Sequence, residues 1–557
     1  MESYDDQRPW LKTYPAWLPA ELPVPNLSLL DEFLHSVAAY PADPCIHYFD
    51  RSWSYADIRQ MAEALAVALA EMGTAEGDRI IVLMQNIPQA VVACLAIWMR
   101  NAVVVPLNPM YTGKDLKHYL SDCGARVIIC QDDLYEERVG VALENRPDVK
   151  VITTSVLDLL GNDQKIPGQF SGVTKQLWAG TRDFMNLVQA HSDRDASIVH
   201  PRPDDLAYLV YTSGTTGPAK GAMIRHRNVI HNALVYEKAC RLNRSDVVLG
   251  VAPLFHITGI VAHQAIAFHL GMPIVMFARF EVGETLRLIE KYRVTFTVAA
   301  ITVYIAMLNH PRLEEFDLSG LKKAYSGGAP VSPSTVKRFR DEMGLVIYNV
   351  YGLTESCSPA TITPLDMEGP VDSHSGALSV GLVVPSHRAW IVDLDNPRVE
   401  LPPGQEGELV LSGPGITDGY WEKPEETENA IKDGRFFTGD VAKFDENGWC
   451  FIVDRKKDLI NASGYKVWPR DVEDVLYKHP AVREAAVIGV PDEYRVETVK
   501  AYVSIFDDYQ GKIGPEELIR FCRQRLAAYK YPRLVEIIDN VPKTLTGKFL
   551  RRQLRER

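Results

Sequence analysis

SYADIRQMAEALAVALAEMG (residues 54–73), DRIIVLMQN (78–86), PQAVVACLAIWMRNAVVVPLN (88–108) and ARVIICQ (125–131) follow one another in this chain. The first segment has the apolar spacing of a helix, the second and fourth are short β-branched runs, and the third combines a helix with a strand. Helices that alternate with short apolar strands are typical of a mostly parallel sheet covered by helices. These segments therefore predict an α/β body.

The pattern changes twice further along. Between residues 390 and 453, short runs broken by Pro and Gly predict antiparallel strands joined by turns. After Asp454 we expect the following elements: a helix over 470–482, strands over 484–490 and 500–506, a helix over 515–527 and a strand over 533–539. About 100 residues of this kind can fold as a separate domain.

The expected fold class is therefore α/β, with a large N-terminal multi-subdomain α/β body of parallel sheets, a β-rich subdomain, and a small mobile C-terminal α+β domain. We place the N-terminal domain at residues 1–454, a hinge at 455–458, and the C-terminal domain at 459–557.

Composition narrows the class of protein. The chain has 557 residues, 46% of them hydrophobic, and a net charge of −12, which disfavours a general nucleic-acid binder. The acidic start lacks the features of a signal peptide, and the apolar run over 90–99 is too short to span a membrane. Eight cysteines without CxxC pairs indicate reduced, mostly buried thiols. We expect a cytoplasmic protein whose basic tail, KFLRRQLRER (548–557), is a solvated helix end or, alternatively, meets a phosphate-rich ligand.

The segment YTSGTTGPAKG (residues 211–221) gathers three glycines, four Ser or Thr side chains and one lysine. It should leave the buried strand AYLVYT (207–212) as a loop. Glycines let backbone N–H groups approach an anion, the hydroxyls add donors, and Lys220 adds positive charge. The loop therefore fits phosphate groups, although it lacks the GK[ST] of a Walker loop. An ordinary turn is the alternative.

YTSGTTGPAKG resembles the phosphate-loop signature of the adenylate-forming superfamily of acyl-CoA synthetases, adenylation domains and luciferases. Eight more segments match in the family's order: APLFHITG (252–259), SGGAP (326–330), YGLTE (351–355), GELVLSGPGITDGYW (407–421), FFTGD (436–440), DRKKDLI (454–460), SGYKVWPRDVE (463–473) and PKTLTGKFLRR (542–552). The resemblance spans essentially the whole chain and is closest to long- and medium-chain fatty acyl-CoA ligases. It implies that a carboxylic acid is joined to AMP from ATP with release of pyrophosphate.

The resemblance also implies which residues hold the triphosphate. The residues expected at the β and γ phosphates are Ser213, Gly214, Thr215, Thr216, Gly217 and Lys220. Thr212 and Glu355 would place Mg²⁺, a role that suits oxygen donors. A helix N-terminal cap is the alternative for Glu355.

The nucleoside site is implied in the same way. We expect Gly328, Ala329 and Pro330 to line the adenine. Tyr351 would stack on the adenine, with Gly352 and Thr354 in the same motif, and Ile452 would pack nearby. Asp440 and Arg455 are expected at the ribose hydroxyls. An ordinary turn residue is the alternative for Asp440.

Two half-reactions on one fold follow from the resemblance. Lys548 would bridge the carboxylate and the α-phosphate, where negative charge concentrates. Lys457 matches the family's hinge position. After adenylation the small domain would rotate to present the face that carries Gly464 and Lys466 to an incoming thiol.

The acid and the acceptor are less well defined. His256 lies where the family has a residue beside the acid tunnel, and a core histidine with satisfied hydrogen bonds is the alternative. The apolar segments 259–271 and 296–308 can form tunnel walls or plain core. Val496 stands where relatives usually have Gly, near the thiol face. The acceptor is therefore CoA or, alternatively, an amine such as an amino acid, and a homodimer is an open alternative.

Overall fold

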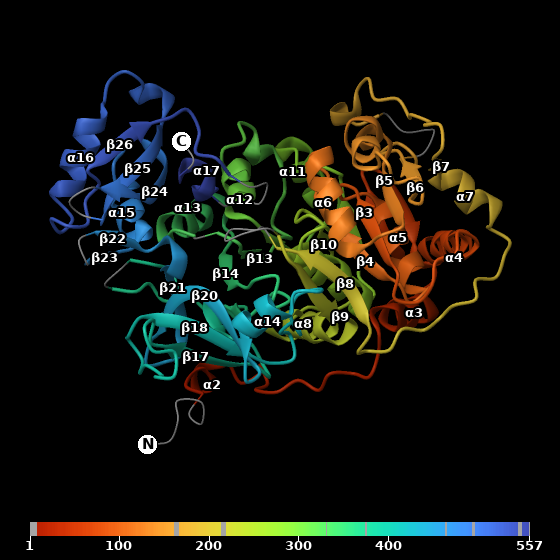
Figure 1. Ribbon diagram of the computed structural model, residues 1–557, viewed down its shortest axis with the longest axis horizontal. Helices are drawn as coiled ribbons and strands as arrows, with labels where there is room; N and C mark the ends of the chain where they lie inside the picture. Colours follow the sequence, from red (N-terminus) through yellow and green to blue (C-terminus); the bar gives the residue numbers. More distant parts are fainter. Residues whose placement is uncertain are drawn as a thin grey trace.

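The computed structural model describes residues 8–160, 166–212, 219–329, 331–373, 376–462, 465–492, 496–543 and 549–555. These residues form three sheets. In Figure 1 a seven-stranded sheet lies at the right, a five-stranded C-terminal sheet lies at the upper left, and most labelled strands of a fourteen-stranded sheet lie between and below them. The predicted α/β fold with a small C-terminal α+β part is confirmed.

The seven-stranded sheet confirms the opening interpretation of the sequence. Its strands, in spatial order, are β7 (Arg182–Asp183), β6 (Lys150–Thr154), β5 (Val127–Gln131), β3 (Arg79–Leu83), β4 (Val103–Pro106), β8 (Leu206–Tyr211) and β9 (Gly221–Arg225). All neighbours are parallel except β8 and β9. Its helices are α4 (Tyr55–Glu71), α5 (Pro88–Trp98), α6 (Gly113–Cys123) and α7 (Phe184–Ala190).

Both faces of this sheet are covered, as parallel strands require. Along β3, Ile80 and Val82 pack into the core that contains α4 and α5, whereas Ile81 and Leu83 pack into a second core with α6. The continuous apolar run in DRIIVLMQN follows from this double burial.

The fourteen-stranded sheet has a parallel half. Its strands are β2 (Arg51–Ser54), β1 (Pro44–Tyr48), β11 (Ile274–Met276), β10 (Val248–Leu249), β12 (Phe296–Ala299), β13 (Lys323–Ser326) and β14 (Ile347–Tyr351). From β1 to β14 all neighbours are parallel, and β2 is antiparallel to β1. The helices of this part are α3 (Leu29–Ala39), α8 (His226–Ala239), α9 (Ile257–Gly259), η4 (Ile260–Ala265), α10 (Ile266–Leu270), α11 (Val282–Tyr292), α12 (Ile301–Leu308) and α13 (Pro333–Met343).

The other half of this sheet is antiparallel, as the Pro- and Gly-broken pattern predicts. It continues from β14 through β15 (Thr361–Ile362), β16 (Gly381–Val383), β21 (Trp449–Arg455), β20 (Arg435–Phe444), β18 (Gly407–Ser412) and β17 (Arg388–Val392), with β19 (Ile431–Lys432) beside β20. The short helices α2 (Trp10–Thr13) and α14 (Pro424–Ala430) border this half, and Trp10 packs into its core. The strand direction therefore changes at β14.

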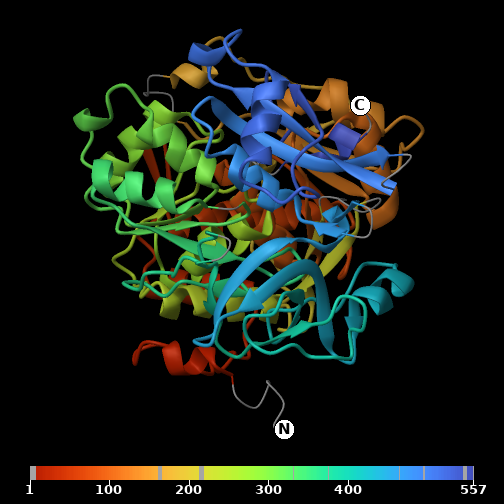
Figure 2. The same cartoon turned by 90° about the vertical axis from the view of Figure 1, so that its left-hand side faces the viewer.

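The C-terminal sheet comprises β23 (Tyr465–Val467), β22 (Ile460–Ala462), β25 (Val496–Ile505), β24 (Val482–Asp492) and β26 (Leu534–Ile537), with helices α15 (Pro469–Leu476), α16 (Pro515–Arg523) and α17 (Arg551–Arg555). Figure 2, which faces this end of the molecule, shows the blue C-terminal elements above the teal antiparallel strands. Helix α15 is shorter than predicted, because Pro480 lacks an N–H and its ring would clash with the carbonyl of Leu476.

The basic tail is not the solvated helix end that the sequence suggests. Arg551 Nη2 lies 2.7 and 2.9 Å from the two carboxylate oxygens of Glu473, and Arg555 Nη2 lies 2.8 Å from Asp458 Oδ1. Leu554 is 1% exposed. Glu473 and Asp458 are both buried, and a buried charge requires a partner. The tail arginines supply that partner, so this end of the chain is not simply solvated.

The expectations on cysteines and on membrane spans can be compared with the described residues. All eight cysteines are buried and free, as predicted. Within the described ranges, no helix combines the length and apolar content needed to cross a lipid bilayer.

A partly buried charge triad joins three helices of the parallel half. His269 of α10 lies 3.0 Å from Glu32 of α3 and 3.1 Å from Glu237 of α8. Burial alone would lower the pKa of His269, but hydrogen bonds to Glu237 and Glu32 raise it to about 9. Protonated His269 therefore stabilises the fold below its usual pKa of 6.5, and this contribution is lost as the pH rises through about 9.

We predict that His269→Gln lowers the free energy of unfolding by up to about 3 kcal/mol near pH 6, and by clearly less near pH 10. Urea unfolding of the variant and the wild type at both pH values measures the difference. His200→Gln is the matched control, because His200 pairs with Asp31 at 3.0 Å but is more than half exposed. Equal losses for the His269 variant at both pH values would contradict the role of the triad.

Candidate active site

Two of the predicted nucleotide motifs begin where neighbouring parallel strands end. β13 ends at Ser326 and β14 at Tyr351, and Ser326 lies opposite Asn349 in the register. Gly328 follows β13 with a φ of 80°, a value that glycine adopts readily, and Ala329 is partly buried. Ligands of open α/β sheets bind outside the carboxyl ends of the strands. The structure therefore brings Gly328, Ala329 and Tyr351 to one sheet edge; Pro330 lies outside the described residues.

Asp440 forms a charged cluster beside this edge. It lies in β20 directly opposite Arg455 in β21, and Arg455 Nε is 2.5 Å from Asp440 Oδ1. The Tyr351 hydroxyl donates to Asp440 Oδ2 at 2.6 Å. Asp440 is 2% exposed and lies inside a ten-residue strand, so its interpretation as an ordinary turn residue is wrong. Three residues predicted for the nucleoside thus contact one another directly.

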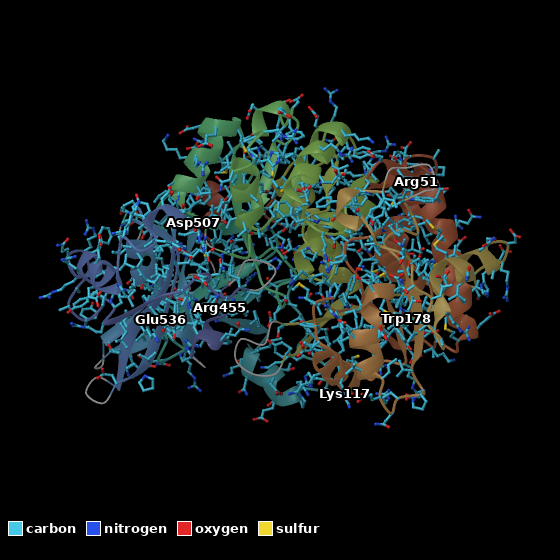
Figure 3. The ribbon with its side chains drawn as sticks, turned by 90° about the horizontal axis from the view of Figure 1, so that it is seen from above. Arg51, Lys117, Trp178, Arg455, Asp507 and Glu536 are labelled. Carbon is cyan, nitrogen blue, oxygen red and sulfur yellow. The ribbon has the colours of Figure 1, made fainter. Side chains whose placement is uncertain are left out.

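The surroundings fix the charge state of this cluster. Burial raises the pKa of Tyr351 well above its usual range, and the Asp440 charge adds to that effect, so Tyr351 stays a hydrogen-bond donor. Tyr351 and Ile452 both pack against the core of the antiparallel half. Arg455, labelled in Figure 3, lies where the chain passes from β21 toward the blue C-terminal part.

The predicted phosphate loop is the tip of the β8–β9 hairpin. Tyr211 pairs with Gly221, the Thr212 N–H donates to the Lys220 carbonyl at 2.9 Å, and the Lys220 N–H donates to Thr212 Oγ1 at 3.4 Å. Thr212 and Lys220 therefore face each other at the base of the loop. The predicted phosphate-binding residues Ser213, Gly214, Thr215, Thr216 and Gly217 lie outside the described residues.

Glu355 follows β14 in a segment of turns, so its interpretation as a helix cap is wrong. The Thr417 N–H donates to the Glu355 carbonyl at 2.8 Å, and the Tyr420 hydroxyl donates to Glu355 Oε1 at 2.8 Å. In the same motif, the Cys357 N–H donates to the Thr354 carbonyl at 3.0 Å. A side chain on Gly352 would lie within 3.3 Å of Ser358 and Pro359 Cα atoms, so the turn is tight.

Tyr420 is a site residue to which the sequence assigns no role. Its ring lies against the Lys220 ammonium, with Nζ 5.0 Å from the ring centroid, and its hydroxyl reaches Glu355. The only sequence signal is its place in GELVLSGPGITDGYW. Nothing in the spacing reveals that Tyr420 contacts Lys220, 200 residues earlier, and Glu355, 65 residues earlier.

The two residues predicted for Mg²⁺ fit a hard cation chemically. They offer a carboxylate and a hydroxyl, which are ligands of the type that Mg²⁺ prefers. Glu355 is partly exposed, and of its two carboxylate oxygens only Oε1 has a hydrogen-bond partner among the described residues. Lys220 and Tyr420 contact each other, and each of them also contacts one of the two predicted Mg²⁺ residues. Lys220 donates its N–H to Thr212, and Tyr420 donates its hydroxyl to Glu355.

His256 stands at the N-terminal end of α9, and the π-helical turn η4 follows directly after α9. Burial lowers its pKa to about 4, so the imidazole is neutral. Among the described residues it has no side-chain hydrogen-bond partner, and the structure therefore does not support a satisfied core histidine. A role beside the acid stays a prediction.

The predicted hinge residue Lys457 lies in the short helix η6 (Lys456–Asp458), where burial lowers its pKa to about 8. Asp454 accepts hydrogen bonds from the Arg455 N–H at 2.7 Å and the Arg470 N–H at 2.9 Å, and burial raises its pKa to about 6. The backbone of Lys466 pairs with Asn461. Gly464 and Lys548 lie outside the described residues; Lys543 and Phe549, on either side of Lys548, form an antiparallel bridge.

Comparison with known proteins identifies the family. The model of the AMP-binding enzyme family matches residues 33–421, and that of the AMP-binding enzyme C-terminal domain matches residues 471–548. The chain belongs to the AMP-binding enzyme family. It is 35% identical to a long-chain-fatty-acid–CoA ligase of Bacillus subtilis over 562 residues, which cover 99% of this chain and 98% of the relative. A long-chain-fatty-acid–CoA ligase of Escherichia coli O6:H1 is also 35% identical, with 98% of each chain covered.

Solved structures agree with this assignment. ATP-bound MatB from Rhodopseudomonas palustris is 27% identical, with a TM-score of 0.82 over 96% of this chain and 99% of that one. The apo form of the same protein, with the same identity and coverage, has a TM-score of 0.73. o-Succinylbenzoate CoA synthetase from Bacillus subtilis, solved with its acyl-adenylate intermediate, is 25% identical, with a TM-score of 0.78 over 94% of this chain and 97% of that one.

The Asp440 cluster generates a stability prediction. Arg455→Met leaves a carboxylate buried without its cation, and we expect a loss of up to about 3 kcal/mol in unfolding free energy. Adding Asp440→Asn should recover part of that loss, because the uncompensated charge disappears. Urea unfolding of the two variants measures both effects.

Arg435→Met, on the same strand as Asp440, is the control, because the pair of Arg435 with Glu400 at 3.0 Å is more exposed and should contribute at most about 1 kcal/mol. Equal destabilisation by the Arg455 and Arg435 variants would show that Asp440 does not depend on Arg455.

Proposed function

We propose that this protein is an AMP-forming acid–thiol ligase that activates an apolar carboxylic acid as acyl-AMP and transfers the acyl group to CoA. The observation that carries the proposal is the buried Tyr351–Asp440–Arg455 cluster at the carboxyl ends of β13 and β14. Full-length relatives at 35% identity that act as long-chain-fatty-acid–CoA ligases support the reaction and favour a fatty acid as substrate.

The first half-reaction joins the acid to AMP. A carboxylate oxygen attacks the α-phosphorus of ATP, a new P–O bond forms, and the bond to the β-phosphate breaks with release of pyrophosphate. Asp440, held by Arg455 and Tyr351, would accept hydrogen bonds from the ribose hydroxyls. Lys220 and the loop over 213–217 would hold the β and γ phosphates, and Lys548 would stabilise the negative charge at the α-phosphate.

Thr212 and Glu355 would hold Mg²⁺ beside the phosphates. When bound, the ion would neutralise part of the triphosphate charge. Glu355 is suited to this role because Tyr420 and the Thr417 N–H fix both its side chain and its backbone.

The second half-reaction forms the thioester. The CoA sulfur attacks the acyl carbon, the bond to the AMP oxygen breaks, and the thiol proton passes to solvent. We propose that residues 459–557 rotate about a hinge over residues 455–458 relative to residues 1–454, so that Gly464 and Lys466 replace Lys548 at the reacting centre. The higher TM-score with ATP-bound than with apo MatB supports the view that the present arrangement resembles the adenylating one.

The acid would lie beside His256, in apolar surroundings. Helix α10 and the π-helical turn η4 before it contribute buried Ile260, Val261 and Ile266, and α12 contributes Ile301 and Tyr304. A neutral His256 would orient the carboxylate by donating a hydrogen bond without a net charge.

We predict that the protein exchanges labelled pyrophosphate into ATP only when Mg²⁺ and a suitable fatty acid are present, and that adding CoA yields an acyl thioester detectable by mass. A panel of acids of increasing chain length identifies the substrate, and the same panel without Mg²⁺ is the control.

Absence of exchange with every acid by folded protein would contradict adenylation. Exchange that is followed by an amide rather than a thioester, when amino acids and CoA are both offered, would retain adenylation and overturn the thiol step.

We further predict that Lys548→Ala slows adenylation about 10²- to 10³-fold, by analogy with the loss of an oxyanion donor, while thioester formation from supplied acyl-AMP stays near the wild-type rate. Single-turnover kinetics of each half-reaction measures the two effects separately. Lys512→Ala, in an exposed turn of the C-terminal part, is the control. Equal slowing of both half-reactions by Lys548→Ala would contradict the proposed exchange of residues at the reacting centre.

A further inference from the structure

Tyr420 connects two site residues that come from different parts of the chain. Its hydroxyl donates to Glu355 Oε1 at 2.8 Å, and the Lys220 ammonium lies 5.0 Å from its ring centroid. Lys220 follows the phosphate loop, whereas Glu355 follows β14. One side chain thus contacts both the cation and the carboxylate expected at the triphosphate.

The backbone that carries Tyr420 is held firmly against the phosphate-loop hairpin. Residues 419–421 extend it as a further antiparallel segment: the Met223 N–H donates to the Gly419 carbonyl at 3.0 Å, Ala222 bridges to Tyr420, and the Trp421 N–H donates to the Gly221 carbonyl at 2.8 Å. The position of Tyr420 is therefore linked to the strand that leaves the loop.

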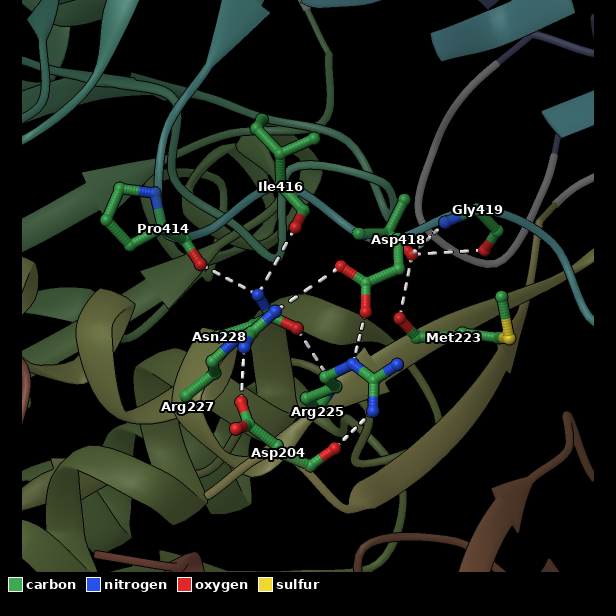
Figure 4. Close-up of polar contacts among 10 residues, drawn as sticks. Asp204, Met223, Arg225, Arg227, Asn228, Pro414, Ile416, Asp418 and Gly419 are labelled. Atoms are coloured by element: carbon green, nitrogen blue, oxygen red, sulfur yellow. Dashed lines mark hydrogen bonds and ion pairs between the residues drawn. The ribbon is translucent and has the colours of Figure 1, made fainter. Parts of the chain in front are cut away.

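Polar contacts upstream of Tyr420 reinforce this attachment, as Figure 4 shows. Asn228 Nδ2 donates to the carbonyls of Pro414 at 2.7 Å and Ile416 at 3.2 Å, Thr417 Oγ1 donates to the Met223 carbonyl at 2.7 Å, and Arg225 pairs with Asp418. At Gly419 a side chain is excluded, because its φ is 132° and a Cβ would lie 2.3 Å from Thr427 Cγ2. These contacts hold the chain that leads into Tyr420 in place.

The environment of Tyr420 also keeps its hydroxyl a donor. The residue is 8% exposed. Burial raises its pKa far above the usual range, and the Glu355 charge adds to that effect. A buried hydroxyl needs a partner, and the described structure offers Glu355 Oε1.

We propose that Tyr420 is a positioning residue for the triphosphate site. Its hydroxyl holds Oε1 of Glu355 so that Oε2 is presented to the divalent cation, and its ring holds the Lys220 ammonium toward the phosphates. This inference rests on the proposed function. The competing interpretation is that Tyr420 is only a packing residue of the hydrophobic core to which it belongs.

Two substitutions separate the two contacts. Tyr420→Phe keeps the ring and removes the hydroxyl, so Glu355 loses its donor while Lys220 keeps its aromatic neighbour. Tyr420→Leu removes both contacts. Lys220 should then lose a cation–π interaction that is worth about 2- to 5-fold in affinity at a partly exposed site.

The experiment measures ATP binding by calorimetry across a Mg²⁺ titration, and again with the cation chelated. We expect Tyr420→Phe to raise the Mg²⁺ concentration for half-maximal ATP binding by about 5- to 20-fold, and to leave Mg²⁺-free ATP affinity unchanged. Tyr420→Leu should show the same shift and, in addition, a loss of about 2- to 5-fold in Mg²⁺-free affinity.

Tyr211→Phe is a matched control. Tyr211 is also 8% exposed, lies in the hairpin against which residues 419–421 are held, and donates a hydrogen bond from its hydroxyl to the carboxylate of Asp122 at 2.7 Å. Its loss should lower thermal stability much as the loss of the Tyr420 hydroxyl does, without changing the Mg²⁺ requirement.

A double-mutant cycle adds a second readout. In a Glu355→Gln background, Tyr420→Phe should no longer change the Mg²⁺ dependence, because the carboxylate that Tyr420 positions is gone. If Tyr420→Phe and Tyr211→Phe lower stability alike and neither changes the Mg²⁺ requirement, Tyr420 is a packing residue and the inference is wrong. If wild-type protein binds no ATP with or without Mg²⁺, the proposed function fails and the inference fails with it.

Discussion

The buried carboxylate of Asp440 constrains the whole nucleotide side of this molecule. A carboxylate that is 2% exposed is stable only with a cation and hydrogen-bond donors around it. Arg455 and Tyr351 supply these from two further strands, β21 and β14. The pairing therefore fixes the end of the parallel half against the antiparallel half. Because Arg455 is also the last residue of β21, the same contact fixes the point from which the C-terminal part departs.

The location of the site follows from the change of strand direction at β14. To one side of β14 the strands are parallel, so the loops after β13 and β14 emerge at the same edge. To the other side the strands are antiparallel, and β20 and β21 bring Asp440 and Arg455 to that edge. In a purely parallel sheet, no antiparallel strands would bring Asp440 and Arg455 to this edge. In a purely antiparallel sheet, the carboxyl ends of two neighbouring strands would not lie at the same edge.

Local pattern was enough to predict much of the fold. The helix over residues 54–73, the strand at 79–83 and the strand before the phosphate loop each have an unambiguous period and length, because both sheet faces or one helix face are buried. What the sequence could not predict are pairings between distant segments. The fourteen-stranded sheet joins residue 44 to residue 455, Tyr420 reaches Lys220 and Glu355, and Arg551 reaches Glu473. Such pairings depend on register and tertiary packing, which no local period encodes. The composition of the tail likewise does not reveal that two buried carboxylates, those of Glu473 and Asp458, hold it.

The contacts at the proposed hinge are of a kind that can be exchanged. Among the residues that the structure describes, the two hydrophobic cores of the C-terminal part draw their members from residue 460 onward and none from the large body. Arg470 makes polar links across the boundary: its N–H donates to Asp454, and its Nη1 donates to the Ile452 carbonyl at 3.0 Å. A hydrogen bond that gives way to water changes the free energy by only about 1 kcal/mol, whereas separating an apolar interface costs about 25 cal/mol for each Å² exposed. Rotation about residues 455–458 would therefore leave the C-terminal cores intact. The arginines of α17, which bind Asp458 and Glu473 on either side of β22 and β23, would carry the chain that contains Lys548 along with the turning part.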